Sequence, residues 1–434
     1  METARTEVIF ADTKPGIAPA VNEVFEHFGG GGKLLRSSRD VYIKVNGVGP
    51  EPYVFTDREV LRETILYFRR CGARTIYVME NCTQANFTRL VFHGAGYLRV
   101  CSETGAVPVF LDETAAVPVF LEGIEEFVDL SRFAFERLIE QRAENLYLSL
   151  PKLKTHSMSQ VTLSIKNQFG LVHQKSRIAD HNYRLHQKFA DIYRLLRPDF
   201  ALIDGLIATN HGHYPTAYNA PKCVVPVDLL IGGLDPLATD VVGAALMGFD
   251  LAGVRHLDLC RAAGIGQSDL SRIELINRHL FEERKKNFTC ELLDDYPPDI
   301  TFLRGRERCC KEGCRRNTES IVEMIYRDHG GKGGFAILMG KGIDKDAVDR
   351  IQGRAHIAGS CAIQDYGLPL QARLGRRNVT MSPGCNDLAQ STAGLCKQMR
   401  IHPIQLSQVD PVRSLALFVL AKLKGSRANI VPLI

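Results

Sequence analysis

The 434-residue sequence contains no tryptophan, and it lacks the patterns of several specialised classes of protein. No apolar stretch is long enough to span a bilayer, and the first seven residues lack the apolar core of a signal peptide. No long lysine or arginine tract is interleaved with aromatic residues, and the net charge of +5 is small for this length. We therefore expect a cytoplasmic, globular protein that binds neither nucleic acid nor a membrane.

The chain is long enough to bury more than one hydrophobic core. Its hydrophobic content is 45% over 434 residues, which favours two domains over one. A charged, proline-bearing stretch at residues 281–299 interrupts the pattern of apolar segments. We place the boundary there, with a first domain over residues 1–285 and a smaller second domain over residues 300–434.

Apolar strands alternate with amphipathic helices in both predicted domains. This alternation predicts a mostly parallel sheet with crossover helices in the first domain and a smaller doubly wound α/β domain after it. In the first domain we expect strands at 41–45, 75–79, 145–150 and 200–203, and helices at 56–70, 133–141 and 186–196. In the second we expect strands at 335–339, 355–358 and 378–381, and helices at 345–351 and 387–399.

The segment 151–170 concentrates lysines, a histidine and an amide around a short apolar run. Lys152, Lys154 and His156 follow the strand expected at 145–150, so we expect them just past its carboxyl end, where open α/β sheets bind ligands. Lys166 and Asn167 come later in the same segment. This set of side chains predicts a site for an anionic small molecule; the alternative is a solvated basic loop.

Several motifs resemble the family catalogued as domain of unknown function 362. They are P-K-L-K-T-H at 151–156, V-T-L-S-I-K-N-Q-F-G at 161–170, K-V-N at 44–46, I-D-G at 203–205 and D-P-L-A-T-D at 235–240. The resemblance covers roughly residues 40–275 and adds Lys44 and Asn46 to the expected substrate site. Members of that family often carry a bacterial-ferredoxin module, so the resemblance implies iron–sulfur redox chemistry. This chain has no C-x-x-C-x-x-C-x-x-x-C-P run, so a ferredoxin-type pair of clusters does not carry over.

Four of the twelve cysteines are expected to meet at one edge of the second domain. Cys361 and Cys385 each follow a predicted strand, and a glycine-containing turn carries Cys310 and Cys314, with Cys309 as the alternative to Cys310. Neighbouring lysine and arginine residues favour the thiolate form, which binds metals. Cys310, Cys314, Cys361 and Cys385 are therefore predicted ligands of a [4Fe–4S] cluster or, less favoured, of structural zinc. Buried core thiols, or a catalytic or disulfide-forming pair, are the other interpretations.

Candidate proton-transfer groups lie in the first domain. His156 belongs to the basic segment, and His211 follows the strand expected at 200–203 in a loop. Asp204 ends that strand, where a carboxylate would offset the lysine charges or bind a cation. We therefore predict His156, His211 and Asp204 as catalytic groups, although a lone histidine is more often structural.

The leading interpretation is a cytoplasmic, iron–sulfur-dependent redox enzyme. The basic residues would hold a carboxylate or phosphate, a histidine would move protons, and the thiolate centre would pass electrons from a donor protein. The alternative is a non-catalytic protein that binds or delivers a metal or cofactor.

Overall fold

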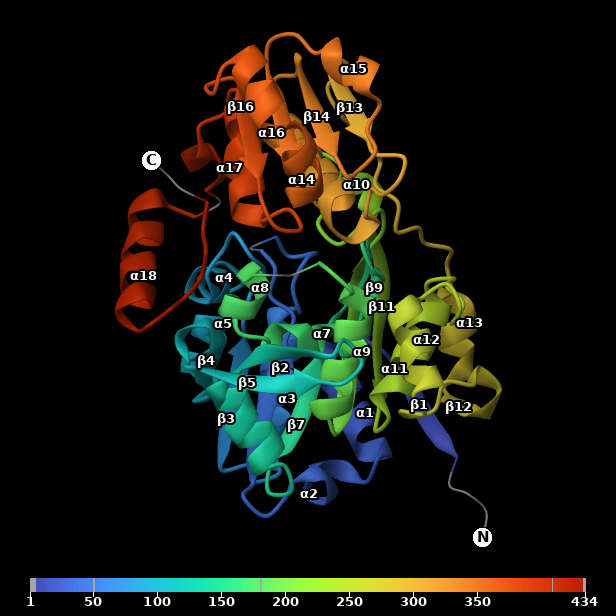
Figure 1. Cartoon of the computed structure of the whole chain (residues 1–434). Coiled ribbons are helices and arrows are strands. Elements are labelled where there is room, and N and C mark those ends of the chain that lie inside the picture. Colours follow the sequence, from blue (N-terminus) through green and yellow to red (C-terminus); the bar gives the residue numbers. More distant parts are fainter. Residues whose placement is uncertain (1–4, 50, 180–181, 408, 432–434) are drawn as a thin grey trace.

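The computed structural model describes residues 5–49, 51–179, 182–407 and 409–431. These residues form a large part (residues 5–284) around a ten-stranded sheet and a small part (residues 300–407) around a four-stranded sheet (Figure 1). A separate two-stranded sheet consists of β5 (Ala116–Leu121) and β6 (Glu126–Ser131). The expected α/β fold class is confirmed.

The large sheet is mostly parallel. Its strand order is β12-β1-β11-β10-β7-β2-β3-β4, and only β11 runs antiparallel to its neighbours along this path, for the residues described. The strands are β1 (Thr6–Asp12), β2 (Asp40–Val45), β3 (Thr75–Glu80), β4 (Val107–Phe110), β7 (Leu146–Leu150), β10 (Phe200–Thr209), β11 (Val224–Gly233) and β12 (Ile273–Ile276). Because β2, β3 and β7 are parallel neighbours, their carboxyl ends meet at one edge of the sheet.

Amphipathic helices cover both faces of the large sheet. Helix α3 shows why they form: Asp57 caps it by accepting from the Glu59 amide, and apolar residues spaced three or four apart face the sheet. One face carries α1 (Ile17–His27), α3 (Arg58–Arg70) and α5 (Tyr97–Thr104); the other carries α9 (Leu185–Leu195), α11 (Pro236–Leu246) and α12 (Arg255–Ala262). The remaining helical segments of this part are α2 (Gly30–Leu34), α4 (Thr88–Gly94), η1 (Leu111–Glu113), α6 (Arg132–Phe135), η2 (Glu136–Glu140), α7 (Ser164–Asn167), η3 (Gln168–Leu171), α8 (Gln174–Ala179), α10 (Ala220–Cys223), η4 (Leu270–Arg272) and α13 (Arg278–Arg284).

The first residues of the basic segment, expected just past the end of the strand at 145–150, form a strand of their own. Strand β8 (Lys152–His156) pairs with β10 and, in antiparallel register, with β9 (Gln160–Thr162). The three basic residues alternate with Leu153 and Thr155, which is the period-two pattern of a strand. All five residues of β8 are buried, so its basic side chains need partners inside the protein.

The small part is a parallel sheet with helices on both faces, as expected. Its strand order is β13 (Ile300–Arg304), β14 (Phe335–Met339), β15 (Ala355–Ala358) and β16 (Val379–Ser382), of which β13 was not predicted. Helices α14 (Arg316–His329) and α17 (Leu388–Gln398) pack on one face, and α15 (Lys345–Asp349) and α16 (Ser360–Leu374) on the other. The turn η5 (Lys311–Arg315) precedes α14, and η6 (Pro403–Leu406) follows α17.

The predicted boundary coincides with residues 285–299, which contain no helix or strand and join the two parts. Whether the two parts fold independently stays a prediction. The C-terminal helix α18 (Pro411–Leu423), which we assigned to the second domain, instead packs on α4 of the large part, where the Phe87 and Phe418 rings lie 5.5 Å apart (Figure 1). Within the described ranges, every helix is too short or too polar to cross a bilayer.

Candidate functional site

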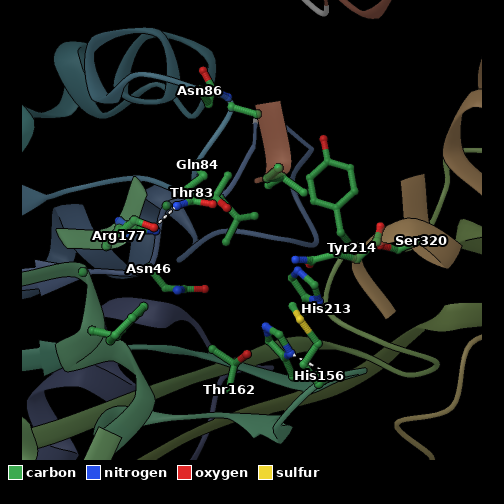
Figure 2. Close-up of a pocket in the computed structure, with 18 of the residues that line it drawn as sticks. Asn46, Thr83, Gln84, Asn86, His156, Thr162, Arg177, His213, Tyr214 and Ser320 are labelled. Atoms are coloured by element: carbon green, nitrogen blue, oxygen red, sulfur yellow. Dashed lines mark hydrogen bonds between the residues drawn. The ribbon is translucent and has the colours of Figure 1, made fainter. Parts of the chain in front are cut away.

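A polar cavity of about 280 Å³ lies between the two parts (Figure 2). The large part supplies the residues that follow β2 and β3, together with the β8–β9 hairpin, α7 and α8. The small part supplies residues of α14 and α17, including Asn317 and Ser320. The cavity therefore uses the carboxyl edge of the large sheet and is closed by the small part.

One wall of the cavity is built on a buried ion pair between Lys44 and Glu80. The Lys44 ammonium contacts the Glu80 carboxylate and also donates to the Val45 carbonyl at 2.8 Å and to Asn167 Oδ1 at 3.3 Å. Glu80 accepts from the amides of Gly47 at 2.7 Å and Asn81 at 2.8 Å. Burial lowers the pKa of Lys44, and the Glu80 charge opposes that effect. Lys44 is thus satisfied within the wall and leaves no free charge for a ligand.

Two further cations, Lys166 and Arg177, line the cavity without a carboxylate partner of their own among the described residues. Lys166 is half-buried, and burial, Arg177 and Lys44 together lower its pKa to about 7. Arg177 is 5% exposed and donates through Nη1 to the carbonyls of Asn81 and Cys82, while its Nε has no partner in the described residues. Lys166 Nζ lies 5.6 Å from the centre of the Phe189 ring, and the Arg177 guanidinium lies 5.6 Å from that of Phe169, so both cations border the cavity while resting on aromatic rings.

Neutral hydrogen-bonding groups face the same space. Asn46 Oδ1 and Thr162 Oγ1 are buried atoms with no hydrogen-bond partner in the part of the chain described, and both side chains line the cavity (Figure 2). The imidazole rings of His156 and His213 stack with centroids 3.8 Å apart (Figure 2). His156 Nδ1 accepts from the Met158 amide, which places the proton of the neutral ring on Nε2. The Asn46 and Thr162 oxygens are therefore available to hydrogen-bond with a ligand in the cavity.

Lys152, Lys154 and Asp204 do not line this cavity, contrary to the expectation that the lysines meet there. Lys152 Nζ lies 3.0 Å from Asp204 Oδ2, and both side chains are fully buried. Asp204 also accepts from the amides of Asp57 at 2.6 Å and Leu206 at 3.1 Å. Lys154 donates to the Val54 carbonyl at 2.6 Å, and burial lowers its pKa well below the usual value. Lys152, Lys154 and Asp204 hold strand β8 in place, because each finds its partners inside the protein.

His211 also lies outside the cavity. Its φ angle is 59°, and its Nδ1 contacts the Glu291 carbonyl at 3.1 Å in the segment that joins the two parts. His213, two residues later, lines the cavity in its place. Sequence reasoning also missed Arg177 and Glu80; the position of Glu80 at the end of β3, beside the strand that carries Lys44, was an available signal.

A second cavity, of about 320 Å³, is lined by Cys310, Cys314, Cys361 and Cys385. These are the four cysteines expected to meet at the edge of the small sheet, and Cys309 does not line the cavity. Arg308 Nε lies 3.2 Å from Cys310 Sγ, and burial raises the pKa of the Cys314 thiol to about 12. Within the described ranges, no three or more His, Cys, Asp or Glu side chains form a group that could hold a metal ion.

The two cavities are neighbours along the chain. Cys314 lines the cysteine cavity and Asn317 lines the polar cavity, so their Cα atoms are at most about 11 Å apart. The Asn182 amide also donates to the Cys385 carbonyl at 2.8 Å, which ties the large part to the cysteine cavity. One short stretch of chain therefore contributes to the walls of both cavities.

Comparison with known proteins confirms the family resemblance. Residues 41–245 match the family described as Domain of unknown function (DUF362), a segment that includes Lys44, Lys166 and Arg177 but ends before the four cysteines. The chain is also similar to a thylakoid-associated protein of Synechocystis sp. (strain ATCC 27184 / PCC 6803 / Kazusa), with 24% identity over 245 residues, which are 54% of this chain and 71% of that protein.

Proposed function

We propose that the protein is an iron–sulfur-dependent redox enzyme that acts on an anionic small molecule. The observation that supports the proposal is a pair of cavities joined by the chain from Cys314 to Asn317, one lined by two cations without a carboxylate partner among the described residues and the other by four cysteines. A carboxylate or phosphate in the polar cavity would face Lys166 and Arg177. A centre bound by the cysteines would include Cys314, three residues before Asn317 of the polar cavity. Electron exchange between a protein-bound centre and a substrate requires the two to be close together.

The cysteine cavity supplies the number and kind of ligands that an iron–sulfur cluster takes, although in this structure the four thiols do not converge on one point. Such clusters are held by four cysteine thiolates, and four cysteines line this cavity. Arg308, which already contacts Cys310, would stabilise the thiolate form. A bound cluster supplies one-electron transfer. A four-cysteine structural zinc site is the alternative with the same ligands.

In the polar cavity, the roles follow from charge and hydrogen bonding. Lys166 and Arg177 bind the anionic group of the substrate, and Asn46 and Thr162 orient its polar atoms. His156 and His213 would give or take a proton, because their stacked rings line the cavity. The Lys44–Glu80 pair supports the wall and does not contact the reacting atoms directly.

Anaerobic purification followed by absorption spectroscopy and assays for iron, zinc and acid-labile sulfide tests the cluster. Cys361→Ala and Cys385→Ala should lose the iron, the sulfide and the visible absorption. Cys260→Ala and Cys396→Ala are matched controls, because both thiols are fully buried in apolar cores and neither lines the cavity, and they should keep the cluster.

Three outcomes separate the alternatives. Equal amounts of iron and sulfide that disappear in Cys361→Ala support the proposal of a redox enzyme, provided that dithionite also bleaches the visible absorption. Zinc without sulfide supports a structural site. Metal or cofactor that transfers to an apo-acceptor protein, without any reducible absorption, supports the rival function of binding and delivery.

A further inference from the structure

Helix α18 is apolar on its outer face as well as on its inner face. On the inner face, Phe418 and Ala421 pack against Phe87 of the large part. On the outer face, the exposed fractions are 77% for Val412, 56% for Leu415, 49% for Val419 and 80% for Leu423. A helix that is apolar all round is normally covered on every side, so the outer face of α18 requires an occupant.

The outer face is a continuous stripe with basic residues along both sides. At 100° per residue, its apolar side chains fall within an arc of about 140°. They are Val412, Leu415, Ala416, Val419, Leu420 and Leu423. Arg413 and Lys424 flank the arc on one side. Lys422 flanks it on the other, where its ammonium donates to the Ser426 and Ala428 carbonyls, and Asp410, which caps the helix, is followed by no aspartate or glutamate up to residue 431.

We propose that α18 docks the protein onto an anionic membrane surface. The helix has 13 residues and is therefore about 20 Å long, which is too short to cross the hydrocarbon core but suits a helix lying in the interface. Anionic headgroups neutralise the flanking lysines and arginine, whereas the α18 of a second copy would bring the same positive charges together. The expectation of no membrane partner rested on the lack of a long apolar run, which a helix in the interface does not need.

The absence of tryptophan makes a direct test possible. In Val419→Trp, the only tryptophan of the chain lies on the outer face of α18. With vesicles of phosphatidylcholine and phosphatidylglycerol, its emission should shift to shorter wavelength and the protein should sediment with the vesicles. Leu368→Trp is the matched control, because Leu368 is 78% exposed on α16; its emission should stay unchanged while the protein still sediments.

Two further variants test the two forces separately. Val412→Ser with Leu423→Ser should abolish sedimentation without lowering the free energy of unfolding, since both side chains are exposed. Lys424→Gln should weaken binding to anionic vesicles about fivefold, and each further replacement of a basic residue on α18 should weaken it by about the same factor. Failure of the unaltered protein to bind anionic vesicles would overturn the proposal. So would a shift of the Val419→Trp emission that appears without vesicles and grows with protein concentration, because it would show self-association.

A different observation concerns the substrate itself. An apolar cavity of about 150 Å³ lies between α18 and α4, lined by Phe87, Leu90 and Phe418. It shares Ala85, Asn86, Leu406 and Val431 with the polar cavity, so the two spaces adjoin. We infer, resting on the proposed function, that the substrate is an amphiphile whose anionic group lies at Lys166 and Arg177 and whose apolar tail enters this second space.

Calorimetric titration with straight-chain carboxylates from butyrate to decanoate tests this inference. Affinity should rise about fourfold for each CH₂ until the apolar cavity is filled. Leu406→Trp, which blocks the junction, should remove the dependence on chain length and keep the binding of butyrate. If all carboxylates bind with equal affinity, the inference of an amphiphilic substrate is refuted, whereas the proposed anion site is supported. If none binds, the anion site of the proposed function fails together with it.

Discussion

The buried Lys152–Asp204 pair gives the sharpest test of how strand β8 is held. Both side chains are fully buried, with Lys152 Nζ 3.0 Å from Asp204 Oδ2. Asp204 also accepts from the amides of Asp57 and Leu206, so one carboxylate satisfies three donors. Burial raises the pKa of Asp204, and the Lys152 charge opposes that effect. The carboxylate therefore depends on its partners, and they depend on it.

Asp204→Ala leaves a buried ammonium and two amides without their acceptor. Removing one partner of a buried ion pair costs about 3 to 5 kcal/mol, whereas replacing both partners by apolar groups is close to neutral. The hydrogen bonds from the two amides to Asp204 are lost in the single and in the double variant, so they lower the free energy of unfolding of both. We expect Asp204→Ala to lower the free energy of unfolding by about 4 kcal/mol, and the double variant Lys152→Met with Asp204→Ala to recover about half of that.

Urea unfolding followed by far-ultraviolet circular dichroism measures both values, because the chain has no tryptophan to report by fluorescence. The single variant Lys152→Met is the control, since it isolates the loss of the lysine. A loss below about 1 kcal/mol for Asp204→Ala would refute the reasoning. Equal instability of the single and double variants would refute it as well, because it would show that the unpaired ammonium contributes nothing.

Three other outcomes are expected. Butyrate binding in the polar cavity should weaken as the pH rises through about 7, because Lys166, whose pKa is lowered to about 7, loses its charge while the carboxylate keeps its own; calorimetry at pH 6 and pH 8 should find no such change in Lys166→Met. Gly170→Ala places a Cβ 2.6 Å from Lys44 Nζ and should lower the free energy of unfolding by about 3 kcal/mol, whereas Gly32→Ala, with open space around it, should not. Limited proteolysis should cut first within residues 285–299, and protection of that segment would argue against two domains.

The elements that sequence predicted well are those in which local pattern and burial agree. The apolar runs of β2, β3 and β7 and the amphipathic pattern of α9 are each sufficient to define an element. Strand β8 was missed because its alternating residues are lysines and a histidine, which ordinarily indicate exposure. Their burial depends on partners far away in sequence: Asp204 lies 52 residues from Lys152, and Val54 lies 100 residues from Lys154.

The sequence predicts those residues of the polar cavity that lie at or near the carboxyl ends of strands. Lys44, Asn46, His156, Lys166 and Asn167 all line the polar cavity, because each follows or adjoins the carboxyl edge of the large sheet. The choice between neighbouring histidines depends on backbone conformation, since the left-handed residue at 211 turns that side chain toward the joining segment. The four cysteines line one cavity, in keeping with the same reasoning about strand ends, and their binding of a common centre stays a prediction.

Helix α14 links the two cavities mechanically. Arg316, at its start, is 2% exposed and pairs with Glu319 within the helix and with Asp294 in the segment that joins the two parts. Cys314 and Asn317 lie on either side of this anchored residue and line different cavities.

A centre bound by the cysteines would therefore fix the same turn that forms one wall of the polar cavity. If loading the centre changes the affinity of the protein for the anion, then binding the anion must change the affinity of the protein for the centre by the same factor. We expect phosphate to bind more tightly to the loaded protein than to the apo protein in calorimetric titrations. Equal affinities would show that the two cavities are adjacent but independent. Arg316→Met should reduce the coupling, because it releases the start of α14 from the joining segment without altering either set of lining residues.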